Sequence, residues 1–213
     1  MKIAKFEFSL FGINTYVVFD IHSKECVVID PGMINDEERE AMRRFISTND
    51  LKVTGIINTH LHVDHVIADQ WSKKAFDAPI MAHIDDLPLG ERVKEQAQMF
   101  GVPLETENVI VDRWLVPGDK IKVGDGELEV IHVPGHSKGS IALYDAADGF
   151  LISGDALFAG SIGRTDLPGG SMPQLIDSIK SRLLTLPGDT IVYPGHGPAT
   201  TISKEKRQNP YLQ

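Results

Sequence analysis

The segment His60-Leu61-His62-Val63-Asp64-His65 gathers several side chains that could bind metal. Imidazole and carboxylate groups are ligands suited to Zn²⁺, Mn²⁺ and iron. In an extended chain, residues i and i+2 point the same way, so His60 and His62 can meet one ion. Asp64 and His65 follow where the chain turns into a helix, and they can address a second ion nearby. The spacing therefore predicts a centre for divalent metal ions.

Three further candidates, His136, Asp155 and His196, each stand just beyond an expected strand. Sites in open α/β sheets gather beyond the carboxyl ends of strands. We therefore expect separate segments of the chain to bring ligands to one edge. The remaining histidines are interpreted as turn, strand or pocket-lining residues and stay outside the site: His22, His83 and His132.

The pattern in the first part of the chain predicts strands around 3–8, 15–19 and 26–29, followed by a helix. Asn35 can cap that helix, and Glu38 has the spacing of a capping box. A buried strand at 53–57 leads into the ligand segment, a helix follows over 67–75, and 79–81 is a short strand. The charged stretch 85–107 is interpreted as a mostly helical insertion, on the surface or over a site.

The second part returns to strands over 109–153, with a hairpin turn at Asp125-Gly126. Strands at 140–144 and 150–153 precede a helix that begins near Ser171, and 190–193 is a buried strand. The tetrapeptides Val133-Pro134-Gly135-His136 and Tyr193-Pro194-Gly195-His196 echo one another. We therefore predict one α+β domain over 1–213, built from two similar β-rich halves with helices outside.

Composition narrows the class of protein. The chain has 213 residues, 42% of them apolar, and a net charge of −9, which disfavours nonspecific binding to nucleic acid or anionic membranes. The single cysteine, Cys26, excludes an internal disulfide and a multi-cysteine zinc site. No apolar run is long enough for a membrane span, and the first residues alternate like a strand rather than a signal peptide. We expect a soluble cytoplasmic protein and leave its oligomeric state open.

The ligand pattern resembles that of the metallo-β-lactamase-fold superfamily, which carries Thr-His-x-His-x-Asp-His and later His, Asp and His. The resemblance covers essentially the whole chain and implies an αββα sandwich. Asp30, in Ile29-Asp30-Pro31-Gly32, matches the family's early Asp-x-Gly motif, and this implies that it supports the metal loop without binding metal. The matching ligand positions are 59–65, His136, Asp155 and His196.

Within the superfamily, the chain resembles the glyoxalase II-like branch, the hydroxyacylglutathione hydrolases. The segment 158–166 stands where that branch has a glycine-rich stretch with a cationic residue for substrate, and Arg164 matches the cationic position. The planar guanidinium group suits a substrate carboxylate, although a surface ion pair with Asp166 is the alternative interpretation. Few residues follow His196, so the nearest match is the short form without a C-terminal helical domain.

The resemblance implies two divalent ions, with zinc favoured over iron or manganese. One ion would take His60, His62 and His136, and the other Asp64, His65 and His196, with Asp155 as the bridge. Asp64 would also take part in catalysis. A metal-bound hydroxide would then attack the carbonyl group of an anionic thioester such as S-lactoylglutathione. Cys26 is interpreted as a core residue rather than a nucleophile.

A rival reaction class stays open at this point. Persulfide dioxygenases share the fold, bind a single iron and oxidise glutathione persulfide; His60, His136 and Asp155 match their iron ligands. They also carry a segment like Gly163-Arg164-Thr165-Asp166. A lactonase ranks lower, the acidic charge argues against a nuclease, and the intact ligand set argues against a binding protein that has lost its activity.

Overall fold

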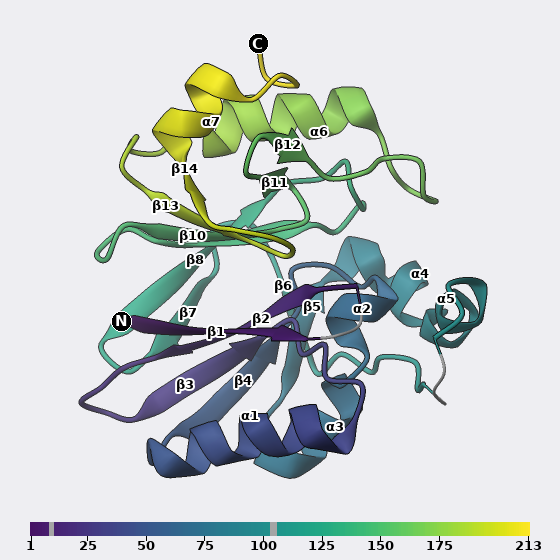
Figure 1. Cartoon of the computed structure of the whole chain (residues 1–213), viewed down its shortest axis with the longest axis vertical. Coiled ribbons are helices and arrows are strands. Elements are labelled where there is room, and N and C mark those ends of the chain that lie inside the picture. The colour runs from purple at the N-terminus through teal and green to yellow at the C-terminus, as the bar shows by residue number, and fades with distance from the viewer. Residues whose placement is uncertain (9–10, 103–105) are drawn as a thin grey trace.

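In the computed structural model, residues 1–8, 11–102 and 106–213 are described, and they form four layers (Figure 1). Helices α1 and α3 cover the outer face of one sheet, and helices α6 and α7 cover the outer face of the other. The two sheets face each other in the middle. The expected αββα sandwich with helices outside is therefore confirmed.

The first sheet comes from the N-terminal half and has the strand order β1-β2-β3-β4-β5-β6. Its first strands form an antiparallel meander, and from β3 onward the neighbours pair in parallel. Parallel pairing places the ends of β3, β4 and β5 at one edge of the sheet. The strands are β1 Lys2–Phe8, β2 Ile13–Phe19, β3 Glu25–Ile29, β4 Lys52–Ile57, β5 Ile80–His83 and β6 Arg113–Leu115.

The second sheet repeats this plan with the order β14-β13-β10-β9-β8-β7. Its first strands are again an antiparallel meander, and β10 then pairs in parallel with β13. The expectation of two similar halves agrees with this order. The strands are β7 Lys120–Val123, β8 Gly126–His132, β9 Ile141–Asp145, β10 Phe150–Gly154, β13 Ile191–Pro194 and β14 Thr200–Thr201, with a small separate pair of β11 Leu157–Phe158 and β12 Ser161–Ile162.

Helices lie outside the sheets and at the edge where the two sheets open (Figure 1). The first outer layer holds α1 Asp36–Thr48 and α3 Asp69–Phe76, and the second holds α6 Met172–Ser178, its π-helical continuation η2 Ile179–Leu183, and α7 Ile202–Gln208. The open edge carries α2 Val63–Val66, the 3-10 turn η1 Ile84–Asp86, α4 Leu87–Gly90 and α5 Val93–Met99. No helix among the described residues is both long and apolar enough to cross a membrane.

Apolar side chains form a separate core between each pair of layers. Val27 and Ile29 of the first sheet pack against Leu128 and Ile152 of the second, all fully buried or nearly so. Met42 of α1 belongs to the cluster beneath the first sheet, and a third cluster lies beneath α6 and α7. Burial of this apolar area drives the layers together, and the polar loops remain at the open edge.

The local predictions agree with most elements and fail at identifiable points. At the expected capping box, Asn35 Oδ1 accepts from Glu38 N, and Glu38 Oε2 accepts from Ile34 N, one residue before the cap. The hairpin turn is Gly124-Asp125, one residue earlier than expected, because Val123 pairs with Gly126 and Gly124 adopts a left-handed φ of 59°.

The helical boundaries differ more. The predicted helix over 67–75 begins two residues later, as α3, because Ala68 N donates to Pro31 O and so separates α3 from α2. Ser171 precedes α6, but its side chain makes no capping hydrogen bond. The stretch 85–107 holds η1, α4 and α5 at the open edge, with 103–105 outside the described residues. Helix α7 was not predicted.

Candidate metal centre

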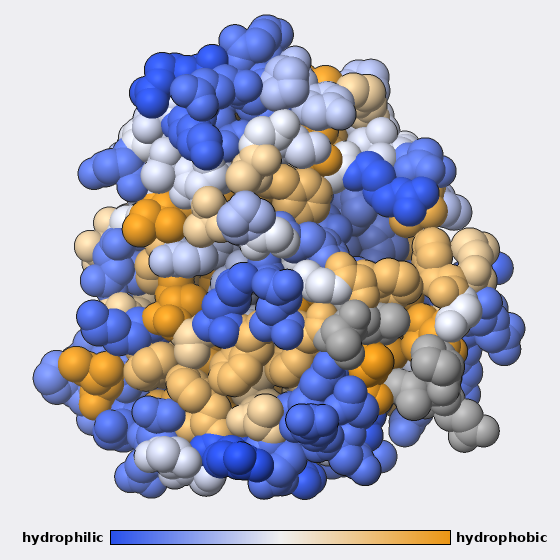
Figure 2. Space-filling view, viewed as in Figure 1, coloured by the Kyte–Doolittle hydropathy of each residue, from blue (hydrophilic) through white to orange (hydrophobic). Residues whose placement is uncertain are grey.

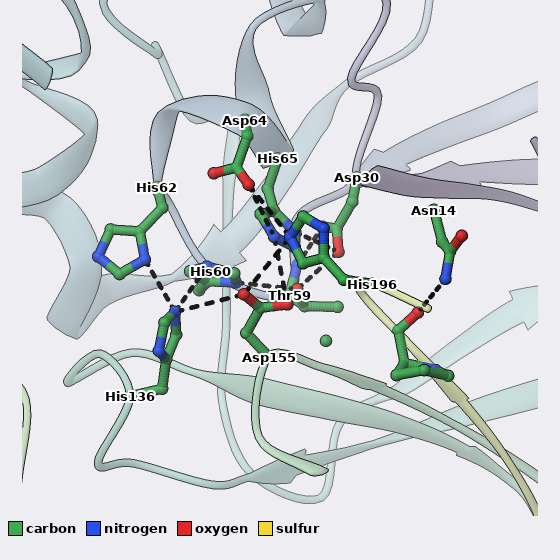
Figure 3. Close-up of polar contacts among 12 residues, drawn as sticks. Asn14, Asp30, Thr59, His60, His62, Asp64, His65, His136, Asp155 and His196 are labelled. Carbon is green, nitrogen blue, oxygen red and sulfur yellow. Dashed lines mark hydrogen bonds and ion pairs between the residues drawn. The ribbon is translucent and has the colours of Figure 1, made fainter. Parts of the chain in front are cut away.

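All the predicted ligands meet at the open edge between the two sheets (Figure 3). The segment after β4 supplies His60, His62, Asp64 and His65. The loops after β8, β10 and β13 supply the other three: His136, Asp155 and His196. Each half of the molecule therefore contributes, and the strand ends place the side chains as the sequence indicated.

The first cluster consists of three buried histidine rings, His60, His62 and His136. His136 Nε2 lies 2.9 Å from His62 Nδ1 and 3.1 Å from His60 Nε2. Zn–N bonds of about 2.0 Å in a tetrahedron place ligand nitrogens roughly 3.3 Å apart. The three nitrogens therefore have nearly the spacing that one ion requires.

The second cluster consists of Asp64, His65 and His196. Asp64 Oδ2 lies 3.2 Å from His196 Nε2 and 3.7 Å from His65 Nε2. Asp155 lies between the clusters, with one carboxylate oxygen 3.4 Å from His65 Nε2 and the other 3.8 Å from His136 Nε2. This carboxylate can therefore address both clusters.

Two buried polar atoms that face the centre lack a hydrogen-bond partner within the described chain, His65 Nε2 and Asp155 Oδ1. A buried polar group without a partner costs free energy, so native proteins rarely tolerate it. Nitrogen and carboxylate donors gathered at this spacing are what a divalent cation satisfies. The residues present therefore fit one metal ion in each cluster.

The two clusters differ in charge. Burial and the neighbouring histidines lower the pKa of His60 well below its usual range and that of His62 to about 3, so these rings stay neutral and offer lone pairs. Burial alone would lower the pKa of His65, but the Asp155 and Asp64 carboxylates raise it well above its usual value. In the chain without metal, the second cluster therefore attracts a proton that the first rejects.

Asp30 holds the second cluster from behind. Its Oδ1 accepts from Thr59 N at 2.7 Å, and its Oδ2 accepts from Thr59 Oγ1 at 2.6 Å and lies 2.9 Å from His65 Nδ1. Asp30 itself adopts a left-handed φ of 51°, which turns its side chain toward the ligand loop. A carboxylate behind a ligand histidine fixes the ring and raises its basicity.

Neutral groups hold the other rings. His136 Nδ1 donates to Arg164 O at 2.7 Å, and His196 Nδ1 donates to Phe11 O at 3.1 Å. His60 Nδ1 lies 3.2 Å from Thr59 Oγ1. In each case the remote ring nitrogen has a partner, and the opposite nitrogen points into the centre (Figure 3).

Two side chains that the sequence did not single out fasten the ligand loops. Gln96 of α5 accepts from Val63 N and donates to Leu61 O, so α5 is fixed to the first ligand segment. Buried Asp86 accepts from Leu61 N and Ser137 Oγ, at 3.1 and 2.7 Å, and thereby joins the ligand loops of the two halves. Neither residue belongs to a local motif, so only the fold reveals them.

The β2 strand forms a clasp with the loop of the last ligand. Asn14 N donates to Gly195 O, and Tyr16 Oη donates to Pro194 O at 2.6 Å. A Cβ atom on Gly195 would collide with the Asp155 carboxylate, so only glycine allows His196 to approach the centre. The repeated Pro-Gly-His signal thus marks a close backbone approach.

Arg164 lines the cavity of about 390 Å³ above the centre, together with Phe11, Phe158 and other residues. Its guanidinium group donates to both carboxylate oxygens of Asp166, at 2.8 and 2.7 Å, in an exposed pair. The two nitrogens that do so are Nε and Nη2, so this pair does not use Nη1.

His83 and His132 stack on each other outside the centre, with ring centroids 4.3 Å apart. Together with Asp85 they form a third group of potential metal ligands. However, His132 Nε2 donates to Lys138 O, and His83 Nδ1 accepts from Asp85 N. His22 lies in a turn in which its backbone N donates to Asp20 Oδ1.

Comparison with known proteins agrees with this arrangement. The model of the metallo-beta-lactamase superfamily matches residues 9–196, and the chain belongs to that superfamily. Members of this superfamily with a His and Asp cluster of this kind bind divalent metal ions, so the chain is a metal-binding member of an enzyme family.

Particular relatives cover the whole chain. It is 37% identical to the hydroxyacylglutathione hydrolase GloC of Haemophilus influenzae, over 100% of this chain and 98% of the relative. The crystal structure of TTHA1623 in a di-iron-bound form is 38% identical with a TM-score of 0.87, over 98% and 100% of the two chains. The structure of ETHE1 from Myxococcus xanthus is 28% identical with a TM-score of 0.81, over 99% and 84%.

Proposed function

We propose that this protein is a dinuclear metal-dependent hydrolase of thioesters such as S-lactoylglutathione. The observation that carries the proposal is the pair of adjacent ligand clusters with Asp155 between them. A centre for a single ion would not need Asp64 and His196 to converge at 3.2 Å. The similarity to GloC supports the choice of a thioester as substrate.

The first ion would be held by His60, His62 and His136, and the second by Asp64, His65 and His196, with Asp155 shared. Zinc suits this mixture of imidazole and carboxylate, although iron and manganese suit it too. When bound, such ions lower the pKa of a coordinated water to about 7 and polarise a carbonyl oxygen.

The side chains around the centre have distinct tasks in this proposal. Asp64 lines the cavity, and with one carboxylate oxygen holding the second ion, its other oxygen would accept a hydrogen bond from the attacking water. Phe11 and Phe158 line the same cavity and limit the access of water. Arg164 lies on this wall and would use its Nη1 group to contact a substrate carboxylate.

The test combines metal content with turnover. Protein purified without a chelator would be analysed for metals by elemental mass spectrometry and assayed on a panel of thioesters. About two ions per chain, together with thioester hydrolysis, is the expected result. A protein that holds two ions and hydrolyses no thioester would refute the substrate assignment but not the dinuclear centre.

The similarity to ETHE1 favours a second candidate, a mononuclear-iron dioxygenase acting on glutathione persulfide. In that case His60, His136 and Asp155 would hold the iron, and the second cluster would be dispensable. About one iron per chain, together with oxygen uptake on glutathione persulfide, would favour this candidate. A lactonase would instead open a neutral lactone, which the same panel can include.

A further inference from the structure

A second cavity, of about 310 Å³, opens beside the metal centre. We call it the side cavity; its wall consists of α4 and α5 residues on one side and of Lys138 and 167–169 on the other. His62, Phe100 and Leu167 line both this cavity and the one above the centre. The two spaces are therefore neighbours, and a substrate held at the metals could extend past His62 into the side cavity.

The lower wall of the side cavity is apolar and exposed. Met99 is 72% exposed and Phe100 is 37% exposed, at the end of α5. Figure 2 shows apolar side chains gathered at the right of the view, over the region of α4 and α5. Exposed apolar groups beside a polar centre are typical of a site for a small molecule.

Two cations line the same cavity, Arg92 at the start of α5 and Lys138 after the first cluster. Neither forms an ion pair with any residue that the structure describes. Arg164, in contrast, already has a carboxylate partner in Asp166. The side chain of Lys138 runs alongside Gly169, which offers no side chain to cover it. Arg92 and Lys138 are thus the cations that line the side cavity and have no carboxylate partner among the described residues.

Acidic groups complete the wall. Glu95 lies on α5 three residues after Arg92, and Asp85 of η1 lines the same cavity. Buried Asp86 is already engaged by backbone and hydroxyl donors. An apolar floor with both cations and anions around it suits a group that carries a carboxylate and an ammonium ion together.

We propose that the side cavity binds the zwitterionic, amino-acid-like end of the substrate's thiol arm, with its carboxylate at Arg92 and Lys138 and its ammonium group at Glu95. This inference rests on the proposed thioesterase function and assigns the recognition of the thiol arm. The reacting thioester carbonyl then lies at the metals, and the arm passes His62 toward α5.

The test compares two thioesters with the same acyl group on the metal-loaded full-length protein. S-Lactoylglutathione carries the zwitterionic arm, and S-lactoyl-N-acetylcysteamine carries a neutral one. The double variant Arg92→Gln/Lys138→Gln is expected to raise KM about tenfold or more for the glutathione thioester, with kcat nearly unchanged. The neutral thioester should change by less than about twofold.

Lys94→Gln is the matched control, because Lys94 is an exposed cation of α5 outside both cavities. It should leave both substrates unaffected. Equal effects of the double variant on both thioesters, or no effect on either, would overturn the proposal.

Glu95→Gln tests the ammonium contact separately. It is expected to raise KM about threefold to tenfold for S-lactoylglutathione. The glutaryl-Cys-Gly thioester, which lacks the ammonium group, should not respond. An equal response of both substrates would remove Glu95 from the assignment.

A direct binding measurement separates this inference from the proposed function. If the wild-type protein hydrolyses no thioester, the proposed function fails, and titration calorimetry with S-hexylglutathione then tests the cavity alone. A dissociation constant weakened about tenfold in the double variant, but not in Lys94→Gln, would support the side cavity. Absent binding, or binding unaffected by the double variant, would overturn it.

Discussion

The two ligand clusters lie side by side but are stabilised in opposite ways. The rings of His60, His62 and His136 pack against one another, burial lowers the pKa of His60 and His62 so that these two stay neutral, and the outer nitrogens of His60 and His136 meet a hydroxyl and a carbonyl group. The second cluster contains a carboxylate ligand, Asp64, and has a buried carboxylate, Asp30, behind His65. The side chains of the first cluster are therefore held in place mainly by packing, and those of the second mainly by interactions between charged groups.

The difference suggests how each cluster would respond to the loss of its ion. His60 and His62, whose pKa values are lowered, keep their lone pairs free when the ion is lost. The loss then costs only the free energy of leaving buried polar atoms without a partner. The carboxylate-rich cluster can instead bind a proton at His65, whose pKa is raised. Protons therefore compete with metal at the second cluster more than at the first.

Removal of one proposed metal ligand from the second cluster is expected to have the largest effect. His196→Ala is expected to lower kcat/KM for thioesters by about a thousandfold, because a dinuclear centre loses one of its ions. The side chain is 25% exposed, so the fold should survive. Circular dichroism and metal content serve as controls, and activity near that of the wild type would contradict the dinuclear proposal.

Removal of the negative charge of Asp30, behind His65, should have the next largest effect on activity. Asp30→Asn preserves the shape but removes the charge behind His65, and we expect a loss of about 10- to 100-fold in activity and in affinity for the second ion. Asp145→Asn is the matched control, because Asp145 is a buried turn residue outside the centre. Equal losses in the two variants would show that Asp30 acts only on folding.

In the chelator-treated protein, the pH dependence of the free energy of unfolding should reveal the lowered pKa values of the first cluster. The unfolded chain protonates His62 below about pH 6.5, whereas the folded chain does so only at about pH 3. Stability is therefore lost as the pH falls from 6.5 toward 3, by roughly 2 kcal/mol per such histidine between pH 7 and pH 5. Urea unfolding of His62→Gln should show a correspondingly smaller loss.

His65→Gln provides the opposite arm of that experiment. The pKa of His65 is raised, so its contribution is fully present below about pH 6.5 and is lost as the pH rises through the raised value. The variant should therefore lose stability mainly at low pH. The same pH dependence in both variants would mean that the clusters do not differ in charge as described.

The smallest effect is expected from Arg164→Ala. The backbone carbonyl that receives His136 Nδ1 remains, so the first cluster should be intact. The guanidinium group is already shared with Asp166, and we expect KM for an anionic thioester to rise by about threefold. Steady-state kinetics on anionic and neutral thioesters would check this, and a rise above about tenfold would make Arg164 the main contact for the substrate anion.

Much of the fold and of the site could be predicted because the signals are local. Alternating apolar residues marked most strands, and the spacing of His60, His62 and His65 placed ligands at a strand end. The hairpin turn was misplaced by one residue, since Gly124 and Gly126 both flank Asp125 and only strand register distinguishes them. The break between α2 and α3 was missed because the hydrogen bond from Ala68 to Pro31, which separates them, is tertiary.

The resemblance pointed to Asp30 as a supporting residue, but Asp86 and Gln96 could not be predicted, for the same physical reason. Asp86 accepts a hydrogen bond from Ser137, which lies 51 positions later in the chain. Gln96 donates to Leu61, which lies 35 positions earlier. Single polar residues of this kind look like solvent-exposed positions in the sequence. Only the packing of α5 and η1 against the ligand loops gives them a task.

The clasp between β2 and the last ligand loop has a consequence for folding. Tyr16 and Pro194 are 178 positions apart, so their contact closes only after nearly the whole chain has been synthesised. Until then the inner face of the first sheet, with Val27 and Ile29, lacks its covering layer. Such long-range closure slows folding and leaves apolar surface of the nascent N-terminal half exposed on the ribosome, where aggregation competes with folding.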